Sequence, residues 1–116
     1  MTDAGAGDPF EPLERLGLAP GEPPSRVAVE AFLRAAGVEP YAWSNGPGDR
    51  YAVHEHGYTK LLMCAAGSIT FHLDGGHEVE LHPGEGFVLP PGTRHAATVG
   101  PEGCSCLEGH RGTSGP

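Results

Sequence analysis

Short runs of alternating apolar and polar residues recur along the chain from residue 39 onward. The clearest run is SITFHLDGGHEVELH, in which two sets of apolar residues flank a DGG turn and each set occupies one face of a strand. These residues are Ile69, Phe71 and Leu73 before the turn, and Val79 and Leu81 after it. The run predicts a β-hairpin. Glycine- and proline-rich turns separate the remaining runs, so the pattern predicts an all-β domain that closes into a small β-barrel or jelly roll.

A pattern of helical period precedes the strands. Ser25 is a suitable N-cap and Gly37 a suitable end for one amphipathic helix over 26–38. Its expected buried face holds Val27, Val29, Phe32, Leu33 and Ala36. Residues 1–25 contain 5 of the 12 prolines, and PLERLGL is their one candidate for a helical turn. We therefore expect a flexible leader over 1–25, a barrel domain over 39–111 and a short tail over 112–116.

Composition narrows the range of partners. The formal net charge is −8, and no basic stripe with interleaved aromatic residues indicates nucleic-acid binding. No segment reaches the roughly 20 apolar residues of a membrane span, and no signal peptide is recognisable, so a cytoplasmic location is expected. The odd number of cysteines, Cys64, Cys104 and Cys106, favours free thiols over a disulfide framework.

The histidines carry the candidate chemistry. His54 and His56 are one residue apart, so on a strand both imidazoles emerge from the same face and their neutral nitrogens suit a borderline metal ion. The wider spacing forms two motifs, which are Gly48-x5-His54-x-His56-x3-Lys60-x6-Gly67 and Gly84-x5-Pro90-x-Gly92-x2-His95. Sixteen residues separate them. Both motifs resemble those of the cupin superfamily, and the short gap resembles that of its smallest single-domain members.

The resemblance implies a cupin barrel in which His54, His56 and His95 bind one divalent transition metal ion. Iron is the favoured metal, with nickel, copper, manganese or zinc as alternatives, and a homodimer is expected. Two positions depart from the family pattern. Lys60 stands where the first motif normally has a ligating glutamate, and Val99 stands where the second usually has asparagine.

Lys60 is the only lysine in the chain, and an ammonium has no lone pair for a metal. Three arrangements follow, in order of preference. Lys60 turns away and leaves a three-histidine site; its ammonium pairs with a metal-bound anionic substrate; or, deprotonated, it ligates the metal or acts as a base. Tyr58 is the second candidate catalytic residue, with packing on the barrel rim as its alternative role.

Other polar residues have simpler interpretations. Cys104 and Cys106 share a strand face with Glu108 and His110, which allows a second metal site, although a buried core role suits the cysteines better. His72 and His82 fall on outward faces. Arg50 and Arg94 flank the histidine segments and are within reach of a substrate carboxylate, but surface solvation is the simpler role for both.

Three functions remain open from the sequence. The first is a metal-dependent oxidoreductase, an iron dioxygenase acting on a small anionic organic molecule, because three-histidine cupin sites occur in such enzymes. The second is a non-catalytic binding or sensing module for a small organic anion. The third is a metal-assisted isomerase or lyase acting on a sugar acid, with Lys60 or Tyr58 as acid or base.

Overall fold

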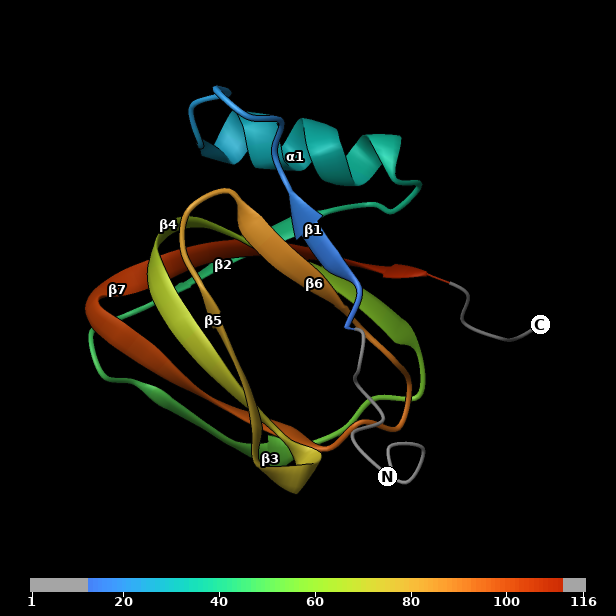
Figure 1. The fold of residues 1–116 in the computed structure, drawn as a ribbon, viewed down its shortest axis with the longest axis vertical. Helices are drawn as coiled ribbons and strands as arrows, with labels where there is room; N and C mark the ends of the chain where they lie inside the picture. Colours follow the sequence, from blue (N-terminus) through green and yellow to red (C-terminus); the bar gives the residue numbers. More distant parts are fainter. Residues whose placement is uncertain (1–12, 112–116) are drawn as a thin grey trace, which may run out of the picture.

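The computed structural model describes residues 13–111, in which seven strands of one antiparallel sheet curl into a barrel (Figure 1). The strands are β1 (Arg15–Gly17), β2 (Tyr41–Asn45), β3 (Arg50–His54), β4 (Thr59–Leu73), β5 (His77–Leu81), β6 (Glu85–Leu89) and β7 (His95–Arg111). The long strands β4 and β7 pair with each other along most of their length. β2 and β3 pair with β7, β5 and β6 pair with β4, and β1 pairs with β6. The all-β cupin-type fold expected from the sequence is confirmed.

The predicted hairpin forms where the alternating pattern places it. β4 and β5 pair with Ile69 opposite Leu81 and Phe71 opposite Val79, and a short 3₁₀ turn (Asp74–Gly76) connects them. All four side chains are buried in the barrel interior. Alternation places them there because successive side chains of a strand point to opposite faces.

Helix α1 (Arg26–Ala35) lies outside the barrel (Figure 1). Its N-cap is the predicted one, because the Ser25 hydroxyl accepts a hydrogen bond from the Ala28 amide at 3.0 Å. Val29 and Leu33 are fully buried in a second apolar cluster, with the outward side chains of β4 and β7. Val27 departs from the expected face, since 76% of it is exposed.

Part of the predicted flexible leader is a strand. β1 pairs with β6, with Leu16 opposite Gly86, and the Leu18 amide donates to the Gly84 carbonyl at 3.0 Å. Residues 15–17 of PLERLGL are therefore extended rather than helical, because pairing with an open sheet edge decides their conformation. Residues 1–12 and the predicted tail over 112–116 lie outside the described residues.

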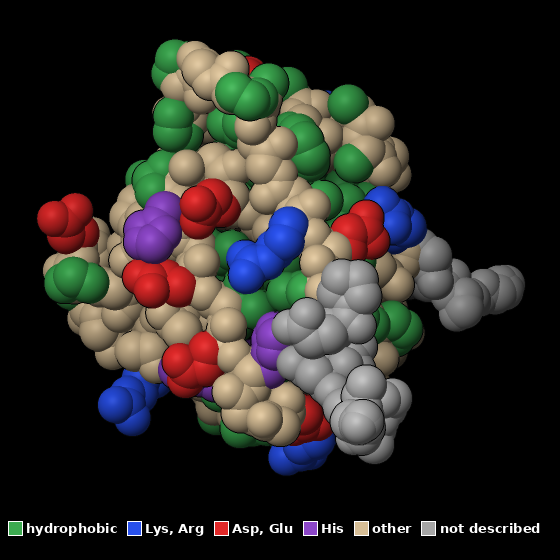
Figure 2. All heavy atoms as spheres, viewed as in Figure 1, with side chains coloured by type: hydrophobic (Ala, Val, Ile, Leu, Met, Phe, Trp, Pro, Cys, Tyr) green, Lys and Arg blue, Asp and Glu red, His purple; other side chains and the backbone are tan. Residues whose placement is uncertain are grey.

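The charged side chains on one face of the molecule are scattered. On the face drawn in Figure 2, Lys and Arg side chains stand apart from one another among Asp, Glu and His. Within residues 13–111, no helix has the length and apolar character needed to cross a membrane.

Candidate metal centre

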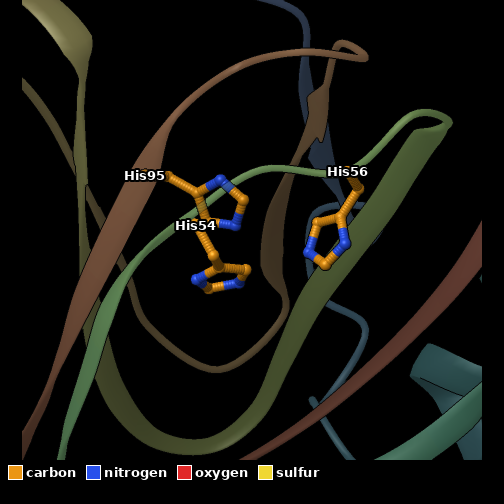
Figure 3. A group of neighbouring side chains, drawn as sticks. All are labelled: His54, His56 and His95. Atoms are coloured by element: carbon orange, nitrogen blue, oxygen red, sulfur yellow. The ribbon is translucent and has the colours of Figure 1, made fainter.

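Three histidines converge at one end of the barrel interior (Figure 3). His54 ends β3 and His95 begins β7, and the pairing of these strands sets the two residues opposite each other, with ring centroids 4.2 Å apart. His56 lies in the loop before β4, with its ring 4.9 Å from that of His54 and 5.4 Å from that of His95. The two residues of the H-x-H pair therefore do not share a strand face as predicted; the loop turns His56 toward the other two.

One ligand atom from each imidazole lies within 4.8 Å of the others. Among the histidine, cysteine and acidic side chains of residues 13–111, these three histidines form the one group of three or more that is close enough to hold a metal ion. A second metal site around Cys104, Cys106 and Glu108 therefore has no support in this region. Both cysteines, like Cys64, are free and buried, as their core role requires.

The hydrogen bonds of the three rings select one tautomer. Nδ1 of His54 lies 2.8 Å from the Ala52 carbonyl, and Nδ1 of His95 lies 2.9 Å from the Thr93 carbonyl. A carbonyl only accepts, so both Nδ1 atoms carry the proton and both Nε2 atoms carry a lone pair. Nε2 of His56 lies 3.2 Å from the Lys60 ammonium, which only donates, so this Nε2 is also an acceptor. All three rings thus offer Nε2 as the donor atom for a metal ion.

The protein keeps the rings of His56 and His95 uncharged near neutral pH. Burial, with a contribution from the nearby Lys60, lowers the pKa of His56 to about 4. Burial also lowers the pKa of His95. A neutral imidazole is the form that binds a metal ion, so these environments favour coordination.

Lys60 does not turn away from the site. Its side chain is 9% exposed, and its Nζ lies 3.2 Å from His56 Nε2 and 3.2 Å from Glu108 Oε2. The preferred arrangement from the sequence is therefore wrong, because β4 directs Lys60 into the barrel. An ion pair with Glu108 offsets the cost of burying its charge there.

Glu108 is the important residue that the sequence analysis undervalued. Its side chain is 6% exposed; Oε1 accepts from the Trp43 indole at 2.9 Å, and Oε2 accepts from the Tyr41 hydroxyl as well as from Lys60. Burial, assisted by Glu108, raises the pKa of Tyr41. One signal was available: Glu108 follows Cys104 and Cys106 at strand spacing, so it shares the strand face of two residues expected in the core.

Tyr58 lies beside the histidines on the outer side of the site. Its hydroxyl is 3.1 Å from His56 Nδ1, and its ring stacks on those of His56 and His110, at centroid distances of 5.0 and 3.9 Å. His110 is part of β7. Tyr58 therefore combines the two roles considered from the sequence, packing on the rim and contacting a candidate ligand.

The remaining polar candidates lie away from the histidine cluster. Arg94 is exposed and 4.0 Å from Glu55, and Arg50 is exposed on β3. His72 contacts Glu78 and Thr98 on the outer face of the sheet, and His82 contacts Glu80 and Glu85. All four have the surface roles predicted for them.

A pocket of about 270 Å³ opens beside the histidines. Its polar lining includes His54, His95, Lys60 and Glu108. The rest of the lining is largely apolar and comes from Tyr41, Trp43, Tyr51, Leu62 and Phe71. The pocket therefore offers both charged groups and apolar or aromatic surface to a ligand, on the scale of a small molecule.

Residues 36–107 match the AraC-like ligand binding domain, so the match covers more than half of the chain. The chain is a cupin of the AraC-like ligand-binding family. The match includes both histidine segments and most of β7. No curated protein sequence matches this cupin.

Solved structures resemble the cupin over its barrel. A structure of the DMSP lyases RdDddP and RnDddQII is 29% identical, with a TM-score of 0.61, and the DMSP lyase DddQ from Ruegeria pomeroyi DSS-3 is 25% identical, with a TM-score of 0.60. Each covers 66% of this chain, which spans only 39% of theirs. An RmlC-like cupin from Shewanella frigidimarina NCIMB 400 is 22% identical with a TM-score of 0.56, covering 63% of this chain and 64% of its own.

The donor set fits a divalent transition metal ion. Three neutral imidazole nitrogens suit iron, nickel, copper or zinc better than magnesium or calcium, which prefer oxygen. The carbonyl partners of His54 and His95 fix the ring orientation, as partners of metal-binding histidines commonly do. Coordination by His56 requires its Nε2 to release the hydrogen bond from Lys60.

Proposed function

We propose that this cupin binds one divalent transition metal ion through His54, His56 and His95 and holds a small organic anion beside it. The convergence of the three rings carries the proposal, because one ligand atom of each lies within 4.8 Å of the others. The shared tautomer supports it by leaving a lone pair on each Nε2. Iron is the expected metal. A metal ion bound there supplies Lewis-acid polarisation of a coordinated oxygen.

The charges around the site favour an anionic ligand. The three imidazoles are neutral ligands, and the charges of Lys60 and Glu108 offset each other. The charge of a divalent metal is therefore left uncompensated by the protein, and an anion in the pocket compensates it. The aromatic and aliphatic side chains in the same lining suit a short apolar remainder. A small carboxylate is the ligand class that combines both features.

A metal-assisted lyase is the second candidate function. Tyr58 is the candidate acid or base for this reaction, and its hydroxyl is held 3.1 Å from His56 Nδ1. The similarity to DMSP lyases supports the same reaction class, although this chain spans only 39% of their length. The substrate class proposed for this candidate is a small carboxylate with a leaving group, in place of the sugar acid considered from the sequence.

Two further alternatives follow from the sequence and the family. The iron dioxygenase rests on the absence of a ligating carboxylate in the first motif. Non-catalytic sensing is supported by membership of a ligand-binding family. The homodimer is likewise a proposal, and light scattering of the purified protein checks it.

Turnover assays separate these functions. Protein reconstituted with Fe(II) under anaerobic conditions is mixed with DMSP, short thiols, diketones and keto acids, and three readouts are taken: ligand-induced thermal stabilisation, O₂ consumption and product formation by NMR. His54→Ala is the control that removes one ligand. Stabilisation by at least one anion that disappears in His54→Ala supports the proposal; no His54-dependent stabilisation by any of them contradicts it.

The same assays separate the catalytic alternatives. O₂ consumption assigns the oxygenase, and O₂-independent product formation assigns the lyase. Stabilisation without turnover assigns the sensor. Tyr58→Phe keeps the ring that stacks on His56 and His110 but removes the hydroxyl. In the lyase case, this variant should retain ligand binding and lose most of kcat.

A further inference from the structure

Lys60 donates to two acceptors that differ in how firmly they are held. Its Nζ lies 3.2 Å from both His56 Nε2 and Glu108 Oε2. Glu108 is fixed by Trp43 and Tyr41, which donate to its two oxygens. His56 lies in a loop and is one of the three candidate metal ligands. The contact with Glu108 is therefore the anchor of Lys60, and the contact with His56 is the one that can change.

Metal binding and Lys60 compete for the same electron pair. An imidazole nitrogen has one lone pair, and Nε2 of His56 uses it to accept from Lys60. Coordination of a metal ion by this atom takes that lone pair and breaks the hydrogen bond. Lys60 is then left with an unpartnered N–H inside the barrel, which is costly because the side chain is buried.

We infer that Lys60 transfers its hydrogen bond from His56 to the bound anion, and that metal and anion consequently bind with positive cooperativity. The inference rests on the proposed function. The anion supplies the acceptor that Lys60 loses when the metal binds, so each ligand removes a cost of binding the other. Glu108 is a positioning residue, because it holds the ammonium at the pocket wall and is not one of the three candidate metal ligands.

This role explains why position 60 holds a lysine instead of the glutamate that is usual in the first cupin motif. A glutamate there would strengthen metal binding whether or not an anion were present. With lysine at this position, the protein binds the metal weakly when no anion is present and more tightly when an anion is bound. One exchanged hydrogen bond to a charged group corresponds to an effect of about tenfold in affinity.

Calorimetry with Ni²⁺ and acetate tests the inference without any activity assay. Ni²⁺ affinity is measured with and without saturating acetate in the natural protein, in Lys60→Met and in Arg50→Gln. Arg50→Gln is the matched control, because it removes one positive charge from β3 but leaves Lys60 and His56 in place. The natural protein and Arg50→Gln should bind Ni²⁺ about tenfold more tightly with acetate. Lys60→Met should bind Ni²⁺ more tightly without acetate and lose most of the acetate effect.

The possible failures are distinguishable. Suppose Ni²⁺ binding depends on His54 and His95, but acetate has the same effect in Lys60→Met as in the natural protein. This result overturns the inference and leaves the proposed function standing. Equal Ni²⁺ binding by the natural protein and a His54→Ala, His95→Ala variant overturns both.

A second measurement uses the natural protein alone, so it does not depend on the folding of Lys60→Met. The ¹⁵N NMR signal of the Lys60 ammonium should change when Zn²⁺ is added and change again with acetate. A signal that responds to Zn²⁺ but is the same with and without acetate overturns the inference.

Discussion

Lys60 and Glu108 form an ion pair inside the barrel, with 3.2 Å between Nζ and Oε2 and less than a tenth of either side chain exposed. The pair connects β4 to β7 beside the histidine cluster. Removing one partner of such a pair leaves the other charge buried without compensation, whereas removing both partners leaves no uncompensated charge. The pair is therefore expected to behave as one energetic unit.

Glu108→Ala should lower the free energy of unfolding by about 3 kcal/mol, because it strands the Lys60 charge and removes the acceptor of Trp43 and Tyr41. The double variant Lys60→Met, Glu108→Ala should lose clearly less than the sum of Lys60→Met and Glu108→Ala alone. Urea denaturation of all four proteins measures the coupling. Additive losses would show that the pair does not act as a unit.

Two histidines of the candidate site should respond differently to truncation. His54 is exposed, so His54→Ala should abolish metal binding and change stability by no more than about 0.5 kcal/mol. His95 is 3% exposed and bonded to the Thr93 carbonyl, so His95→Ala should abolish metal binding and also cost about 2 kcal/mol. Metal titration and thermal denaturation check both variants. A fully stable His95→Ala variant would contradict the burial argument.

Two motif glycines provide a matched pair. Gly67 has φ +73°, and a Cβ there would lie 2.0 Å from the Gly103 carbonyl oxygen. Gly92 has φ +75°, but a Cβ would meet nothing within 4 Å. Gly92→Ala should cost about 1 kcal/mol from backbone strain alone, and Gly67→Ala several times more. Equal midpoints in urea would contradict the predicted close approach of β4 and β7 at Gly67.

The raised pKa values of the tyrosines predict a loss of stability at alkaline pH. Burial raises the pKa of Tyr41, Tyr51 and Tyr58, the three tyrosines of the chain, above the ordinary value of 10.0. Between that value and the raised pKa, the folded protein holds more protons than the unfolded chain, so stability falls as pH rises above 10. Tyrosinate absorbance should therefore appear together with the loss of the β-sheet circular dichroism signal. Ionisation near pH 10 in an intact fold would contradict this expectation.

The sequence predicts those parts of the fold that depend on local pattern. The alternation from Ile69 to Leu81 predicts the hairpin because a strand with one buried face has an apolar residue at every second position. Ser25 and Gly37 predict the helix ends because capping is a local interaction. In contrast, β1 has three residues and no usable periodicity, so its pairing with β6 follows from the assembled sheet.

The site shows the same division between local and long-range information. Motif spacing identifies His54, His56 and His95 as candidates, and the structure brings them together. The partner of Lys60 is not predictable from spacing, because it depends on the register of β4 against β7, which places Leu62 opposite Glu108. Motif spacing alone therefore favours a Lys60 that turns away from the site. In the structure, Glu108 of β7 supplies the carboxylate that holds Lys60 in the barrel.

The central claim is that three histidines of this cupin bind one metal ion. Elemental analysis of untagged protein, with the His54→Ala, His95→Ala variant purified in parallel, tests it most directly. We expect close to one transition metal ion per chain in the natural protein and almost none in the variant, with iron as the expected element. Equal metal content in the two proteins, or no metal in the natural protein even after anaerobic reconstitution with Fe(II), would contradict it.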